Sequence, residues 1–451
     1  MRPNVLFLFP DQLRWDWIGC AGRVPVRTPN IDGLAARGVR FERVWCNSPV
    51  CAPSRACLTR GLRYHRAGVR NNGDDLDMHA ATYLQRLREA GYRVGTVGKC
   101  DLHKGSCDFA ASGWTPRLER YGFTDAVDQG GKWASHGQLS AGDPEPYTRS
   151  LVAAGLGSAL REDFDRRRRM RGSLRGPWHD TAPSPLPRHH YTDDFCGRSG
   201  LTMLERFPDD SPWFLWVNFP GPHEPFDPPA ELRDRYAGVD FPPPAAPDPH
   251  RPEDHNQIRR NYAAMIEGID EWIGRLLAAV AGRGESERTV VVFASDHGEM
   301  LGDRGRWYKA VPWEASVRVP LILAGPGIPP GRTTQVLAEL IDVAATVLDL
   351  AGVDGIPCWD ARSLLPAAHG AARHRQAQFA ALEDWRAVHD GRHKLIEYQD
   401  GRRSLYDLRA DPEEQDDLAP RDGHAGTVDR LAALLQRESP WPEAAGGALP
   451  R

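Results

Sequence analysis

The sequence predicts an α/β fold with a large mixed, mostly parallel sheet sandwiched by helices, followed by a small C-terminal antiparallel sheet subdomain. Short apolar runs alternate with amphipathic stretches over most of the 451 residues, which is the pattern of parallel strands joined by helical crossovers. After about residue 370, short strand-like runs are joined instead by Asp-Gly turns, which favour antiparallel hairpins. The composition, with 41% hydrophobic and 26% charged residues, is that of an ordinary globular protein.

The first half of the chain supplies two predicted strands and two predicted helices. The run NVLFLF at 4–9 is apolar on both faces and predicts a buried strand. The segment 28–38 begins with Thr and Pro and ends at Gly, which predicts a helix. A second helix over 81–91 leads into a strand over 92–98.

The second half continues the alternation. Strands are predicted over 213–219, 289–296 and 319–325. Between the first two, apolar residues recur at helical spacing from residue 258 up to Gly282. A further helix is predicted over 340–351. Chemistry in such sheets gathers at the carboxyl ends of the strands.

The chain divides, on this pattern, into a catalytic domain over 1–370 and a C-terminal subdomain over 371–451. In the latter, two or three short strands are predicted within 385–408, joined by the turns HDGRH and QDGRR. The segment 140–190 has little periodicity and contains the basic run RRRR. It is interpreted as a solvated helix face or loop, and the alternative is a patch for an anionic polymer.

Composition excludes several classes of function. A net charge of −4 argues against nucleic acid as a partner. No apolar run reaches the length of a membrane-spanning helix, and the short run near the start does not resemble a signal peptide. A cytoplasmic protein is therefore expected. Its eight cysteines are expected to be free thiols. The oligomeric state is not predicted.

Polar residues follow two of the predicted strands. Asp11 and Gln12 come just after the first strand, and Asp296 and His297 follow the strand that begins at residue 289. If these strands are neighbours, one Asp, one amide, a second Asp and one His meet at the same edge of the sheet. This donor set suits a divalent cation.

The pentapeptide CAPSR begins at Cys51. Packing is the ordinary role of a cysteine in a long chain. A reactive thiol needs a neighbouring base or positive charge, which Arg55 can supply one helical turn away. The residues by themselves thus predict an activated group beside a metal and leave its chemistry open.

This pentapeptide resembles the Cys-x-Pro-Ser-Arg signature of type I (formylglycine-dependent) sulfatases, in the alkaline phosphatase superfamily. The segments NVLFLFPDQLRWD, GYRVGTVGK, FPGPHEPFDPP, SDHGEMLGD and LYDLRADPEEQDDLA are also similar to sulfatase segments and occur in the same order. The resemblance implies an alkaline phosphatase-like fold and the conversion of Cys51 to formylglycine by a formylglycine-generating enzyme.

The resemblance also implies roles for individual residues. The implied metal ligands are Asp11, Gln12, Cys51, Asp296 and His297. The implied catalytic residues are Cys51, Arg55, Lys99, His103, His223 and Lys309. Two residues, Asp101 and Asn72, are expected to bind substrate. Asp101 fills the position where the family commonly has a histidine, so either Asp101 or His103 takes that role.

The implied function is hydrolysis of sulfate monoesters by a formylglycine hydrate and one divalent cation. Ca²⁺ is expected, with Mn²⁺ or Mg²⁺ as alternatives. The imidazole of His297 makes Mn²⁺ plausible beside Ca²⁺, because imidazole suits a transition metal. The expected substrate is a small-molecule or carbohydrate sulfate ester. The alternatives are a phosphonate monoester or phosphodiester hydrolase that uses the same site, and an inactive protein that binds sulfated ligands through an unmodified Cys51.

Overall fold

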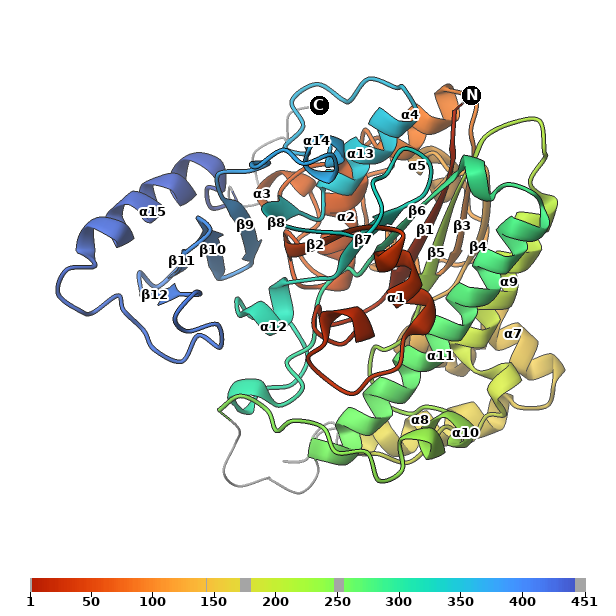
Figure 1. Cartoon of the computed structure of the whole chain (residues 1–451). Helices are drawn as coiled ribbons and strands as arrows, with labels where there is room; N and C mark the ends of the chain where they lie inside the picture. The colour runs from red at the N-terminus through yellow and green to blue at the C-terminus, as the bar shows by residue number, and fades with distance from the viewer. Residues whose placement is uncertain (1, 143, 171–179, 247–254, 443–451) are drawn as a thin grey trace.

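The computed structural model describes residues 2–142, 144–170, 180–246 and 255–442. Its main sheet has eight strands in the order β4-β3-β5-β1-β6-β7-β2-β8 (Figure 1). The strands are β1 (Asn4–Pro10), β2 (Gly38–Trp45), β3 (Arg93–Gly98), β4 (Asp125–Asp128), β5 (Trp213–Phe219), β6 (Thr289–Ala294), β7 (Leu321–Ala324) and β8 (Arg332–Glu339). Only β7 runs antiparallel to its neighbours β6 and β2, so the mixed, mostly parallel sheet is confirmed.

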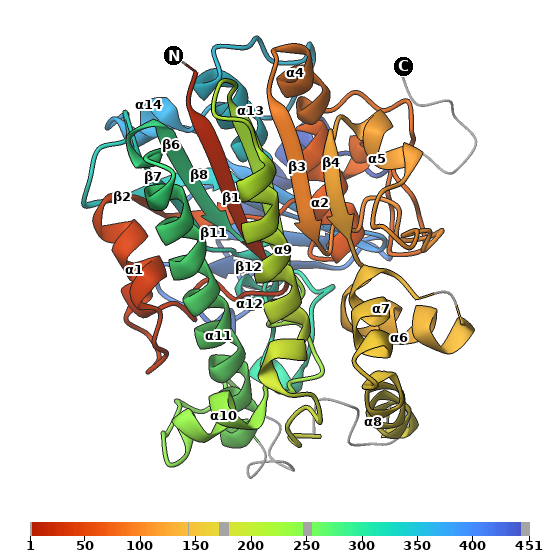
Figure 2. The same ribbon diagram turned by 90° about the vertical axis from the view of Figure 1, so that its right-hand side faces the viewer.

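Helices cover both faces of this sheet. The helices are α1 (Pro29–Ala36), α2 (Cys51–Arg60), α3 (Tyr64–Ala67), α4 (Tyr83–Glu89), α5 (Pro116–Tyr121), α6 (Gly131–Ala141), α7 (Pro146–Ala153), α8 (Gly157–Met170), α9 (Thr192–Arg206), α10 (Ala230–Arg233), α11 (His255–Gly282), α12 (Glu314–Val317), α13 (Asp342–Leu350), α14 (Leu365–Ala368) and α15 (Ala425–Glu438). Apolar residues of α2, α4 and α13 pack on one face. Those of α1, α9 and α11 pack on the other, where α9 and α11 cross in front of the strands in Figure 2. Among the described helices, none has both the length and the apolar character that a bilayer span requires.

A separate antiparallel sheet follows near the C-terminus, as predicted. Its strands are β9 (Gln378–Leu382), β10 (Trp385–His389), β11 (His393–Tyr398) and β12 (Arg403–Asp407), in the order β12-β11-β10-β9. It has one more strand than the upper prediction of three, because β9 precedes the interval 385–408. Helix α15 packs on it through Leu431 and Leu435, at the blue end of the chain in Figure 1. The domain boundary near residue 370 stays a prediction.

The segment 140–190 forms the helices α7 and α8, and its residues 171–179 lie outside the described ranges. The first two arginines of the basic run pair with carboxylates of the chain. The Arg166 guanidinium pairs with Asp163 and Asp180, as does that of Arg167, which is fully buried. Arg168 and Arg169 are exposed on α8, so the run lies in part on a solvated helix face, and the alternative of a patch for an anionic polymer stays a prediction.

Candidate active site

The predicted site residues converge at the carboxyl ends of the central strands. Asp11 directly follows β1, and Asp296 lies two residues after β6, its neighbour. The Gln12 backbone N–H donates a hydrogen bond to Asp296 Oδ1 at 2.9 Å. Cys51 is the first residue of α2. Sheet order therefore brings together residues that lie hundreds of positions apart in the sequence.

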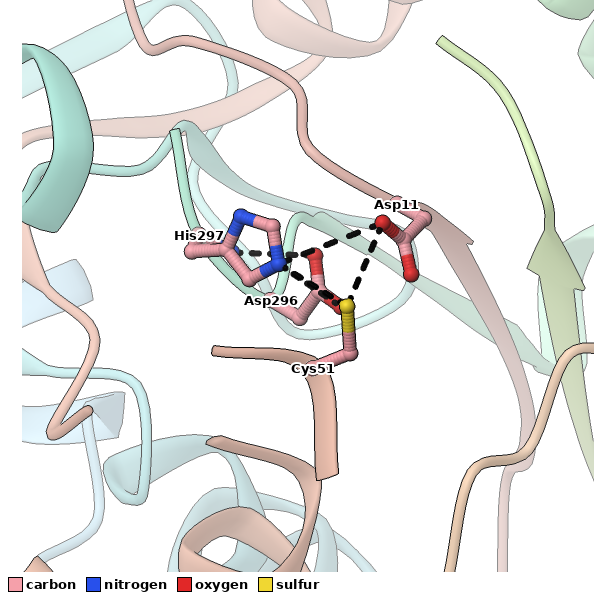
Figure 3. Close-up of side chains that lie close together, drawn as sticks. All are labelled: Asp11, Cys51, Asp296 and His297. Carbon is pink, nitrogen blue, oxygen red and sulfur yellow. Dashed lines mark hydrogen bonds and ion pairs between the residues drawn. The ribbon is translucent and has the colours of Figure 1, made fainter. Parts of the chain in front are cut away.

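Four buried side chains form a compact cluster (Figure 3). The Cys51 Sγ lies 3.2 Å from His297 Nε2 and 3.8 Å from Asp11 Oδ1. The same His297 nitrogen lies 3.7 Å from Asp296 Oδ2. One donor atom from each of the four residues lies within 4.8 Å of the others. Two carboxylates, an imidazole and residue 51 thus form the set that a divalent cation would need.

Arg55 holds the two carboxylates. Its Nε lies 3.0 Å from Asp296 Oδ2, and its Nη2 lies 3.1 Å from Asp11 Oδ2. The Ser54 hydroxyl donates to the Asp296 carbonyl at 2.6 Å. The Ser and Arg of the CAPSR pentapeptide therefore fix the predicted metal ligands, while α2 presents Cys51 to them. The catalytic role implied for Arg55 stays a prediction.

The two carboxylates differ in their electrostatics. Burial acts to raise the pKa of Asp11, but Lys99 and other cations lower it well below its usual value. The pKa of Asp296 is raised by burial and by the negative charge of Asp11. A divalent cation between them would reduce that repulsion, so the local charge fits the predicted metal.

Lys99 lies beside the nucleophile position. Its Nζ is 3.4 Å from Cys51 Sγ and 2.5 Å from Asp11 Oδ2. Burial and Asp11 act to raise the pKa of the Cys51 thiol, but Lys309 and Lys99 lower it well below its usual value. This positive environment suits an anion bound against residue 51.

His223 and Lys309 form a second group of predicted catalytic side chains in the site. His223 Nδ1 lies 2.7 Å from the Glu224 carbonyl oxygen, and its Nε2 lies 2.6 Å from Lys309 Nζ. Burial acts to lower the pKa of His223, but the Glu224 carboxylate raises it. The Glu224 contact thus fixes the orientation of His223, and its Nε2 contacts the Lys309 ammonium group. This arrangement suits proton transfer.

Gln12 is placed differently from the other predicted ligands. Its Oε1 accepts a hydrogen bond from Lys309, and its Nε2 donates to Glu224 and Glu299. Its amide therefore lies beside the four-residue cluster, in a network with Lys309, and its role as a metal ligand stays a prediction.

The remaining predicted residues lie around this centre. Asp101 Oδ2 lies 3.3 Å from Lys99 Nζ, whereas the buried His103 pairs through Nε2 with Asp128 at 2.9 Å. Asp101 is thus the one of the pair that contacts a predicted catalytic residue. Asn72 Oδ1 accepts a hydrogen bond from the Ala52 backbone N–H at 3.0 Å, which fixes the start of α2. The predicted substrate contacts of Asp101 and Asn72 stay predictions.

The prediction did not include three residues that support the site. Asn218 Oδ1 accepts from Arg55 at 2.8 Å, and its place as the one polar residue in the run WFLWVNF was a usable signal. Glu299 accepts from the Tyr308 backbone N–H at 2.7 Å, next to Lys309. Trp385, in the small sheet, donates a hydrogen bond to the carbonyl of Ala310, the residue after Lys309. Nothing in the local sequence indicates this contact.

The profile of the Sulfatase family matches residues 3–353. The chain therefore belongs to the sulfatase family. A second profile, N-sulphoglucosamine sulphohydrolase, C-terminal, matches residues 302–439. This protein is thus an enzyme of the sulfatase family, within the alkaline phosphatase-like superfamily.

Relatives of this sulfatase-family enzyme match over almost its full length. A choline-sulfatase of Rhizobium meliloti (strain 1021) is 29% identical, over 97% of this chain and 86% of the relative. An arylsulfatase of Clostridium perfringens (strain 13 / Type A) is 25% identical, over 97% and 94%. The crystal structure of a phosphonate monoester hydrolase of Agrobacterium radiobacter superposes with a TM-score of 0.79 at 24% identity, over 97% of this chain and 95% of that one. The last likeness concerns the fold.

Proposed function

We propose that this enzyme hydrolyses sulfate monoesters, with a formylglycine formed from Cys51 as its nucleophile and one divalent cation beside it. The observation that carries the proposal is the placement of Cys51. Its side chain contacts His297 and Lys99 at one buried point, next to the Asp11 carboxylate. A nucleophile, cation ligands and an anion-binding lysine are the parts that attack on a sulfate ester needs.

The cation would be held by Asp11, Asp296, His297 and the modified residue 51, with Gln12 proposed as a further ligand. It would neutralise the sulfuryl oxygens as their charge shifts during the reaction. The two carboxylates favour Ca²⁺, with Mg²⁺ as an alternative, and the imidazole makes Mn²⁺ a further alternative to test.

The side chains around residue 51 then act on the ester. Lys99 and Lys309 bind the sulfuryl oxygens, since both ammonium groups face this point. The pair of Lys309 and His223 delivers a proton to the departing alcohol oxygen from the side of His223 Nε2. The aldehyde hydrate of formylglycine supplies one hydroxyl that attacks sulfur, and a second whose deprotonation expels sulfate and restores the aldehyde. The proposed substrates are sulfated small molecules or carbohydrates.

Mass spectrometry of the peptide that contains residue 51 tests the nucleophile, after expression with a formylglycine-generating enzyme. Conversion replaces the cysteine sulfur by oxygen and removes two hydrogens. Turnover of 4-nitrophenyl sulfate is expected to follow the converted fraction and to vanish in Cys51→Ala. A metal-loaded protein that carries an unmodified thiol and turns over no ester, or a fully active Cys51→Ala variant, would refute the proposal.

The same leaving group separates sulfate from phosphonate chemistry. We expect a higher kcat/KM for 4-nitrophenyl sulfate than for a 4-nitrophenyl phosphonate monoester. The reverse order would assign the site to phosphonate monoesters, because the leaving group and its proton donor are held constant.

A further inference from the structure

A cavity of about 490 Å³ lies between the main sheet and the small C-terminal sheet. It is open to solvent beside α12, which Figure 1 shows between the segment around α1 and the strands β10–β12. None of the proposed catalytic or metal-binding residues lines it. Its volume falls in the range of sites for small organic ligands.

Arginines dominate the charge of this cavity. Eight arginines line it, against six carboxylates: Arg14, Arg23, Arg40, Arg43, Arg259, Arg304, Arg318 and Arg409, with Asp16, Glu42, Asp303, Glu314, Glu413 and Glu414. The carboxylates on its inner walls are bonded to cations of the protein. Asp303, for example, pairs with Arg14 and Arg259, and Glu314 pairs with Lys394.

Four of the arginines have no carboxylate partner among the described residues. Arg43 and Arg304 donate only to backbone carbonyls, those of Gly391 and Glu414. Arg23 and Arg409 are exposed at the rim. These four side chains come from four separate segments of the chain, so the fold itself gathers uncompensated positive charge around one cavity.

Two half-buried indole rings lie among these cations. The Arg318 guanidinium carbon lies 3.5 Å from the centre of the Trp15 ring, and that of Arg304 lies 4.6 Å from the centre of the Trp313 ring. A guanidinium stacked on an indole is held in one plane, and its N–H edges can still bind an oxyanion through two hydrogen bonds. The indole faces add flat apolar surface that suits a sugar ring.

The cavity wall also contains buried polar atoms that lack partners. Both ring nitrogens of His389, which is 4% exposed, have no hydrogen bond within the described structure. The same holds for Nε of Arg259, which is also 4% exposed. Burial lowers the pKa of Arg259 to about 10 and that of His389 to about 4. Buried polar groups usually have partners, so these two side chains are unusual among the residues that line the cavity.

We propose that this cavity is a binding site, separate from the active site, for an anionic saccharide that carries sulfate or phosphate groups. Its oxyanion contacts Arg43 and Arg304, and Arg23 and Arg409 attract it at the rim. Its sugar ring packs against Trp15 or Trp313. Arg304 and Lys309 belong to one short segment, so an occupied cavity also steadies the segment that carries the proposed sulfate-binding lysine.

Calorimetric titration of the full chain, with Cys51→Ala to prevent turnover, tests this site with glucose 6-sulfate and glucose 6-phosphate as separate probes. Two binding events are expected for the probe that fits. The double variant Arg43→Met/Arg304→Met weakens one event at least about tenfold, because two charge-assisted contacts are lost. Lys99→Met removes the other event, which belongs to the active site. The probe that binds more tightly shows whether the site prefers a sulfated or a phosphorylated saccharide.

Two further variants serve as controls for this test. Arg437→Met removes an exposed arginine that does not line the cavity and is expected to leave both events unchanged. Arg43→Lys/Arg304→Lys keeps the charge and is expected to restore part of the affinity, which separates lost contacts from misfolding. A single binding event that Lys99→Met abolishes, or the absence of the second event with both probes, overturns the proposal. A concentration-dependent dimer that Arg43→Met/Arg304→Met dissociates would also overturn it, because the face would then be an interface between copies.

Discussion

The Trp385 indole N–H donates a hydrogen bond to the Ala310 carbonyl at 3.2 Å, so the small sheet holds the segment that carries Lys309. The residues on either side of Lys309, Tyr308 and Ala310, have left-handed φ values of 71° and 70°. Such conformations are unfavourable for residues other than glycine and asparagine and persist only when their surroundings enforce them. On the other side, Glu299 binds the Tyr308 backbone N–H.

Trp385→Phe removes this donor and keeps most of the ring. We expect kcat/KM for a sulfate ester to fall about fivefold, the equivalent of one hydrogen bond of about 1 kcal/mol. The fall follows from a less constrained Lys309 and is measured by steady-state kinetics. Trp213→Phe is the matched control, since it also loses an indole hydrogen bond, to Glu285. Trp213 is the first residue of β5, at the end of the strand that lies away from the active site. Equal losses of activity in the two variants would contradict a specific role for Trp385.

Metal binding is expected to stabilise the folded chain. Added Ca²⁺ or Mn²⁺ should raise the free energy of unfolding of chelator-treated protein, by about 2.7 kcal/mol at a hundred times Kd. Asp296→Asn should abolish most of this gain, because it removes one of the two carboxylates. Asp342→Asn is the control, since this buried carboxylate pairs with Arg375 outside the site. If Asp296→Asn keeps the full metal-dependent gain in unfolding free energy, the metal binds at another site.

The sequence predicted the central strands and the meeting of Asp11 with Asp296, because an apolar run followed by an acidic residue is a local signal. The strands β2, β4 and β8 were not predicted. Charged residues alternate along β2, as in Arg40 and Glu42, and this half-exposed pattern does not resemble a buried strand. The strand is fixed instead by pairing with β7 and β8, which no local pattern encodes.

The same distinction applies within the site. Residues inside short motifs were predicted correctly to gather, since each motif carries its own strand end or helix start. The partners of Gln12 and of His103 were not predictable, because they depend on side chains from distant segments. Gln12 contacts Lys309, and His103 contacts Asp128. Long-range side-chain placement is the part that only the folded structure supplies.

His223 is expected to matter most for poor leaving groups. His223→Ala should lower kcat for an alkyl sulfate by about 10²–10⁴-fold and lower it much less for 4-nitrophenyl sulfate, whose leaving group needs little protonation. His103→Ala, which removes a buried partner of Asp128, is expected to reduce stability without changing this dependence. If His103→Ala instead produces the leaving-group effect, the proton donor is His103.

Asp193 is expected to make the stability of the fold depend on pH. Burial raises its pKa to about 7, while its Oδ1 accepts a hydrogen bond from the Gly221 backbone N–H at 2.7 Å, close to His223. The folded chain thus keeps this proton up to about pH 7, whereas an unfolded chain releases it near pH 4. The stabilisation is complete below the lower value and is lost as the pH rises through the window, by up to roughly 4 kcal/mol.

Asp193→Asn keeps an acceptor for Gly221 and removes the titration. Urea unfolding at about pH 5 and about pH 8 should show that wild type loses stability relative to Asp193→Asn as the pH rises. Asp342→Asn should show no such trend, because Arg375 outweighs burial and holds the pKa of Asp342 below its usual value, outside this window. Parallel curves for wild type and Asp193→Asn would mean that Asp193 is already ionised in the folded protein, with Lys132 as the nearby cation that stabilises it.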